Sequence, residues 1–117
     1  MRILVAEDEH TIARLAAQVL KAMGHQVVTV GTCTEAIASI QGEDLFDLVL
    51  LDLHLSDGDS YQVIEAVESM NTVNPRIILM TGEAHPEDDP RVARVAGVLA
   101  KPFDIGQLEE IVARFAD

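Results

Sequence analysis

The sequence predicts an α/β fold in which a doubly wound, five-stranded parallel sheet is covered by helices on both faces. Two observations predict it. Five short apolar runs, of the kind that strands buried on both faces require, alternate with segments whose apolar residues recur at helical spacing. Several runs also end abruptly in charged or turn-forming residues, as residues 47–51 do at Asp52. Alternating strands and helices imply a parallel sheet joined by right-handed crossovers.

The first half of the chain supplies three of the strands and two of the helices. The first helix has apolar residues at helical spacing from Thr11 onward and ends at Gly24, which can adopt the left-handed C′ conformation. The second opens with a capping box at residues 32–35 and stops near Gly42. The five predicted strands of the whole chain are residues 2–6, 26–30, 47–52, 76–80 and 98–100.

Three further helices are predicted after the third strand. The first of these has Asp59 or Ser60 as its cap and is broken by a later Asn-Pro pair. A short helix then begins at residues 89–90, an Asp-Pro pair in which proline takes the first helical position, and ends at Gly97. A second capping box at residues 104–107 opens the last helix.

Composition limits the class of protein. The 117 residues are enough for one domain spanning residues 1–117, with a core built from aliphatic side chains because only three Phe and one Tyr are present. A formal charge of -12 argues against direct contact with nucleic acid, which requires a basic surface. The single cysteine, Cys33, and the lack of a membrane-length apolar run predict a cytoplasmic protein without membrane contact.

Charged and hydroxyl side chains follow four of the predicted strands. Glu7 and Asp8 follow the first, Asp52 the third, Thr81 the fourth and Lys101 the fifth. Each alone has a structural explanation, such as a solvated helix start for the acidic pair, but their common position at strand ends favours one site. Converging carboxylates repel one another, so they either raise a pKa or hold a hard cation such as Mg²⁺. A lysine and a hydroxyl opposite that cation would complete a pocket for phosphoryl transfer, with Asp52 as the nucleophile.

In content and order these motifs resemble the receiver domain of two-component response regulators, over essentially the whole chain. The matching features are the acidic pair after the first strand, Asp52 after the third, Thr81 after the fourth and the Lys-Pro-Phe motif at residues 101–103. The resemblance implies a flavodoxin-like fold with strand order 2-1-3-4-5. It also implies a cis peptide bond before Pro102.

The resemblance further implies that Asp52 accepts a phosphoryl group from a histidine kinase or a histidine phosphotransfer protein. Mg²⁺ would be held by Glu7 and Asp8, directly or through water, together with Asp52 and the backbone carbonyl of His54. The imidazole of His54 would either face the mouth of the site and influence hydrolysis, or be exposed without a role.

Two more residues would bind the phosphoryl group, Lys101 at one oxygen and Thr81 at another. A protein of this kind is a regulatory switch rather than a metabolic enzyme, although it catalyses its own phosphorylation and dephosphorylation. It would act on a downstream partner protein or an output domain, whether the chain stands alone or belongs to a longer protein.

The chain departs from the family pattern at three places. Leu55-Ser56 stands where the family often has Met-Pro, and Asp59-Ser60 stands where the loop usually closes on Asp-Gly. Val98, three residues before Lys101, replaces a Tyr or Phe whose ring commonly turns inward on phosphorylation. We therefore hypothesise that phosphorylation is transmitted through residues 82–97 without a rotating ring.

Two alternative functions are weighed against the phosphoacceptor. A degenerate receiver would bind protein without being phosphorylated, but the key positions are all intact. A phosphohydrolase of the haloacid dehalogenase type also uses an aspartate nucleophile with Mg²⁺. That family requires Asp-x-Asp at the nucleophile, whereas this chain has Asp52-Leu53-His54.

Overall fold

A five-stranded parallel sheet lies at the centre of the structure, a computed structural model that describes residues 1–116. Its spatial order is β2-β1-β3-β6-β7, which is the predicted order 2-1-3-4-5 because a small hairpin of β4 and β5 precedes the fourth sheet strand. The predicted fold class is confirmed. The strands are β1 (Arg2–Ala6), β2 (Gln26–Val30), β3 (Leu48–Asp52), β6 (Arg76–Thr81) and β7 (Gly97–Ala100), with the hairpin formed by β4 (His54–Leu55) and β5 (Gly58–Asp59).

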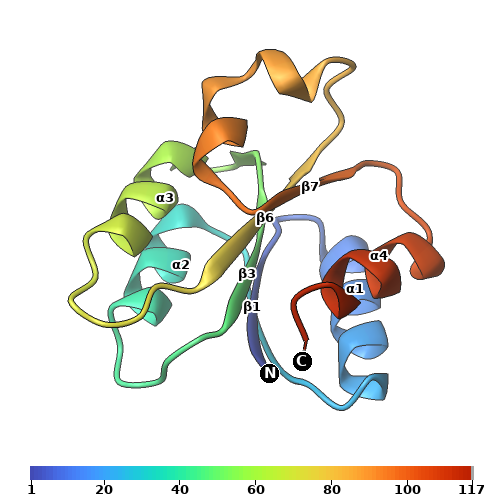
Figure 1. Cartoon of the computed structure of the whole chain (residues 1–117), viewed down its shortest axis with the longest axis horizontal. Coiled ribbons are helices and arrows are strands. Elements are labelled where there is room, and N and C mark those ends of the chain that lie inside the picture. Colours follow the sequence, from blue (N-terminus) through green and yellow to red (C-terminus); the bar gives the residue numbers. More distant parts are fainter. Residues whose placement is uncertain (117) are drawn as a thin grey trace.

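Helices cover both faces of the sheet (Figure 1). α2 (Cys33–Ile40) and α3 (Ser60–Glu68) lie on one face, and α1 (His10–Ala22) and α4 (Ile105–Ala113) lie on the other. Side chains of β1 alternate between the two cores, so that Leu4 packs with α2 and α3 while Ile3 packs with α1 and α4. No helix among the described residues combines the length and the apolar character that a membrane span requires.

The predicted helix boundaries follow from local capping. The Thr32 hydroxyl accepts a hydrogen bond from the amide of Glu35 at 3.1 Å, and Gly24 has the expected positive φ of 95° after α1. Asp59, rather than its neighbour, caps α3 through the amide of Tyr61. The second predicted capping box is complete at the start of α4.

The predicted short helix after Asp89-Pro90 is not an α-helix. Residues 1–116 contain four α-helices, and the connection between β6 and β7 forms two 3₁₀ turns, η1 (Pro86–Asp88) and η2 (Pro90–Arg94). Two prolines four positions apart remove backbone donors that a longer helix would use. A repeat of three residues per turn also places Val92 and Val95 on one side, where both pack against the α2–α3 core. The connection therefore carries few backbone hydrogen bonds and depends on side-chain contacts.

Candidate functional site

The sheet brings the predicted site residues to one edge. Glu7 and Asp8 directly follow β1, Asp52 ends β3, Thr81 ends β6 and Lys101 directly follows β7. These four strands are consecutive neighbours in a parallel sheet, so their carboxyl ends meet on the same side. Strand order thus gathers residues that are up to 94 positions apart in the chain.

Three carboxylates form the acidic part of this site. Glu7 is 2% exposed and Asp52 is 7% exposed, whereas Asp8 lies open to solvent. One oxygen from each side chain lies within 4.8 Å of the other two. Oxygen ligands about 2.1 Å from a Mg²⁺ ion in octahedral geometry are separated by about 3.0 to 4.2 Å, so small side-chain adjustments suffice to coordinate one ion. The donor set therefore fits Mg²⁺ in chemistry and spacing.

Lys101 is the cation that faces these carboxylates. Its ammonium forms ion pairs with Glu7 and with Asp52, the latter at 3.4 Å from Oδ2. Burial opposes the charged form, but the hydrogen bond to Glu7 and the charges of both carboxylates outweigh it, so the pKa of Lys101 is raised above its ordinary value. Lys101 therefore keeps its positive charge beside Asp52. The peptide bond between Lys101 and Pro102 is cis, as the family resemblance implies.

Thr81 and His54 are the remaining predicted site residues, and Thr81 ends the strand on the side of β3 away from β1. Thr81 is buried, and its hydroxyl oxygen accepts a hydrogen bond from the amide of Glu83 at 3.0 Å. A hydroxyl also has a proton to donate, so Thr81 can serve a second partner at the same time. The amide of His54 donates to Oδ1 of Asp52 at 3.2 Å, while its exposed imidazole lies 3.8 Å from Glu83. Coordination by the His54 carbonyl stays a prediction.

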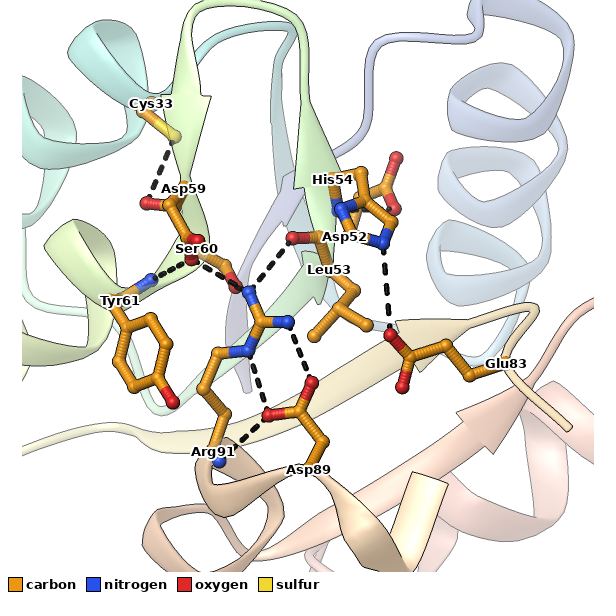
Figure 2. A network of polar contacts seen from close by, with 10 residues as sticks. All are labelled: Cys33, Asp52, Leu53, His54, Asp59, Ser60, Tyr61, Glu83, Asp89 and Arg91. Atoms are coloured by element: carbon orange, nitrogen blue, oxygen red, sulfur yellow. Dashed lines mark hydrogen bonds and ion pairs between the residues drawn. The ribbon is translucent and has the colours of Figure 1, made fainter. Parts of the chain in front are cut away.

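Arg91, which sequence reasoning did not single out, lies beside the site (Figure 2). It is buried, and its guanidinium pairs with Asp89 through Nε and Nη2 and with Asp59 through Nη1. Hydrogen bonds from Arg91 lower the pKa of Asp89 from 3.8 to about 2. The ring of Tyr61 lies 4.9 Å from the guanidinium carbon, which is cation–π geometry.

The loop after Asp52 is also tied to α2. Asp57 accepts hydrogen bonds from the amides of Cys33 and Thr34 at 2.6 and 3.1 Å and another from the Thr34 hydroxyl at 2.9 Å. Asp57 lies in the turn of the hairpin of β4 and β5, and Arg91 contacts Leu53 and Asp59 at the two ends of that hairpin. The loop that departs from the family pattern is therefore fixed by side chains of its own.

Comparison with known proteins supports this description. The family model of the response regulator receiver domain matches residues 3–113. The transcriptional regulatory protein TcrA of Mycobacterium tuberculosis is 33% identical over 92% of this chain and 43% of its own length. The cell cycle response regulator CtrA of Brucella ovis is 31% identical over 97% of this chain and 48% of its own length. The chain thus spans less than half the length of these curated relatives.

Solved structures share the fold. The chemotaxis response regulator CheY4 of Vibrio cholerae aligns with a TM-score of 0.86 at 24% identity, covering 97% of both chains. The receiver domain of the sensor histidine kinase PA1611 from Pseudomonas aeruginosa, whose structure has a magnesium ion coordinated in the active site cleft, aligns with a TM-score of 0.85 at 24% identity, covering 97% of this chain and 95% of its own. With a family model that matches nearly its whole length, the chain belongs to the response regulator receiver domain family.

Proposed function

We propose that this receiver domain is a phosphoacceptor switch, in which Asp52 takes up a phosphoryl group with the help of Mg²⁺. A carboxylate oxygen of Asp52 forms a P–O bond as the bond from phosphorus to the donor breaks, which is a P–N bond in a phosphohistidine or a P–O bond in acetyl phosphate. The leaving group is the histidine imidazole or acetate, respectively. Glu7, Asp8 and Asp52 would hold the Mg²⁺ ion, which would supply charge neutralisation for the phosphoryl oxygens. Lys101 binds one of these oxygens, and the Thr81 hydroxyl donates a hydrogen bond to another.

The position of Lys101 is the observation that carries this proposal. Its ammonium pairs with Glu7 and Asp52 in a largely buried pocket, where electrostatic interactions are stronger than in water. A phosphoryl group entering beside Asp52 can replace one carboxylate as the partner of Lys101. That exchange places positive charge where the transferring group carries negative charge.

The proposed partners follow from the family and from the relatives. A histidine kinase or a histidine phosphotransfer protein supplies the phosphoryl group, and a downstream partner protein or an output domain responds to it. Mg²⁺ is the proposed ion because the acidic cluster fits it and because the PA1611 receiver domain coordinates magnesium in its cleft. Such a chain works in the cytoplasm as a switch rather than as a metabolic enzyme.

The test is the intact mass of the protein after incubation with acetyl phosphate, with and without Mg²⁺. We expect one phosphoryl adduct on the wild type that requires Mg²⁺ and is lost in Asp52→Asn. Asp88→Asn is the matched control, because Asp88 is an exposed aspartate near the same edge of the sheet and should leave the adduct unchanged.

An adduct that persists in Asp52→Asn would place the acceptor elsewhere. If the wild type takes up no phosphoryl group, titration with beryllium fluoride, a stable phosphoryl analogue, decides whether the adduct is short-lived. Absence of binding by either probe would overturn the proposal in favour of a phosphorylation-independent binding module.

A further inference from the structure

We propose that Arg91 is a positioning residue of the phosphoacceptor site, which fixes the loop after Asp52 and joins it to the segment between β6 and β7. This inference rests on the proposed function of Asp52. Arg91 makes no contact with Asp52 that the structure records, so it would act through the residues that follow the acceptor in the chain.

One edge of the guanidinium holds both ends of that loop. Nη1 of Arg91 lies 3.5 Å from the carbonyl oxygen of Leu53, 2.6 Å from Oδ1 of Asp59 and 3.1 Å from the hydroxyl of Ser60. Leu53 directly follows the acceptor, and Asp59 and Ser60 close the hairpin and begin α3. Figure 2 shows the guanidinium between these groups. A single nitrogen therefore spans the loop from its first residue to its last.

The other edge of the guanidinium is held just as firmly. Nε and Nη2 donate to the two carboxylate oxygens of Asp89 at 2.9 and 2.6 Å, a bidentate arrangement that fixes the plane of the group. The guanidinium carbon also lies 4.9 Å from the centre of the Tyr61 ring. The side chain of Arg91 is 8% exposed, so water competes little for these bonds. Arg91 therefore forms a rigid connection between the loop after Asp52 and the segment between β6 and β7.

The loop after Asp52 in turn helps to orient the acceptor carboxylate. The amide of His54, one residue past the carbonyl that Arg91 binds, donates to Oδ1 of Asp52. The amide of Leu53 is held by the carbonyl of Met80 in the neighbouring strand. Displacement of the Leu53 peptide would therefore change the hydrogen bond that orients the Asp52 carboxylate. Residues that orient metal ligands in this way commonly change metal affinity when they are removed.

The same contacts give the segment between β6 and β7 a direct connection to the site. Val98 is a half-buried strand residue opposite Leu79 and offers no ring to move. Arg91 instead belongs to η2, whose Val92 packs against the α2–α3 core. A change at the loop after Asp52 thus reaches η2 through the guanidinium, and by linkage a change at η2 reaches the loop equally.

Two measurements on Arg91→Met test the inference. The first is hydrogen exchange of the amides of residues 53–59 without Mg²⁺, which we expect to become about tenfold faster as the hairpin loses its anchor. The second is the dissociation constant for Mg²⁺ by calorimetry, which we expect to rise about tenfold. An arginine with a merely structural role would leave the Mg²⁺ affinity of the folded protein unchanged.

The matched control is Arg94→Met on the same turn. Arg94 also lies near Tyr61 and pairs with Glu68 of α3, but it makes no recorded contact with the hairpin. We expect both quantities to stay within about twofold of the wild type. Val112→Ala, in the core on the opposite face, controls for lowered stability alone.

Unchanged exchange and unchanged Mg²⁺ affinity in Arg91→Met would overturn the inference, as would equal changes in Arg94→Met or Val112→Ala. Should Arg91→Met not fold, Arg91→Lys serves in its place, because an ammonium keeps the charge but cannot reproduce the fork. A wild type that binds no Mg²⁺ would refute the proposed function instead. In that case the exchange of residues 53–59 alone decides whether Arg91 fixes the loop.

Discussion

Two clusters at the carboxyl edge of the sheet have the same charges, but they differ in how freely the cation can change its partners. Lys101 pairs with Glu7 and Asp52, and Arg91 pairs with Asp59 and Asp89. Each cluster joins one cation to two carboxylates. The ammonium of Lys101 is a point charge that can rotate toward a new partner, whereas the guanidinium of Arg91 is a planar fork whose donors are committed in three directions.

The difference shows how a site that must exchange ligands is kept separate from a site that must keep its geometry. Next to the Lys101 cluster a third carboxylate, Asp8, lies open to solvent, so this site retains capacity for an ion. The Arg91 cluster uses its capacity on carboxylates, a hydroxyl and a backbone carbonyl. We infer that the first cluster serves exchange of ligands and the second serves position.

The largest expected effect on stability comes from removing Arg91, the cation that holds the loop after Asp52 in position. Arg91→Met should lower the free energy of unfolding by about 3 kcal/mol, because it leaves the largely buried carboxylate of Asp89 without its partner. Urea denaturation followed by circular dichroism measures this. The exposed pair of Arg94 and Glu68 provides the contrast, and Arg94→Met should shift the midpoint little. Equal losses in the two variants would contradict the distinction between them.

Removing the other cation should affect the reaction more than the fold. Lys101→Met should slow phosphorylation by acetyl phosphate about 100-fold at saturating Mg²⁺, because the phosphoryl oxygens lose a preorganised positive charge. The rate of adduct formation by intact mass measures this. Circular dichroism of the same sample shows whether the fold is retained. A rate within about twofold of the wild type would exclude Lys101 from the reaction.

The capacity of the first cluster for an ion gives a smaller and separate effect. Mg²⁺ at about ten times its dissociation constant should stabilise the wild type by about 1.4 kcal/mol, since only the folded chain gathers the ligands. Thermal unfolding should shift upward accordingly and should lose this response in Asp8→Asn. Asp88→Asn removes the same charge from an exposed turn and should keep it. Loss of the response in both variants would indicate attraction by net charge alone.

The sequence predicts these two clusters unequally. The sheet follows from apolar runs, and the first cluster follows from the residue directly after each run, because parallel strands carry that residue to a common edge. Arg91 and Arg94 have no such marker. They lie on one turn near the same Tyr61. Apart from the local pair of Arg91 with Asp89, they differ in contacts with residues 26 to 38 positions away.

The connection between β6 and β7 shows the same limit in the backbone. Asp89-Pro90 is a sound signal for the start of a helix, and Asp89 does cap the amide of Arg91. The signal does not specify how the turn continues. Here the bidentate pair between these two residues and the packing of Val92 and Val95 favour a 3₁₀ repeat. Tertiary contacts therefore determine what the local sequence leaves open.

The smallest expected effect is the pH dependence of the stability that Asp89 contributes in the Arg91 cluster. The hydrogen bonds from Arg91 hold the pKa of Asp89 at about 2, below its ordinary 3.8, so the stability they provide is present above about pH 4 and is lost as the pH falls toward 2. Asp89→Asn should therefore lower the free energy of unfolding by about 1 kcal/mol at pH 7, and the difference from the wild type should shrink between pH 4 and about 2. Asp59 faces the same guanidinium and His54 lies near enough to influence Asp89, but both are unchanged in the variant and act on the two proteins alike. Urea denaturation at pH 7, 4 and 2.5 measures the difference. A difference that stays constant over this range would mean that Asp89 contributes by its shape and not by its charge. The charge-dependent contacts of Arg91 would then be limited to Asp59, with the Ser60 hydroxyl and the Leu53 carbonyl as its neutral partners.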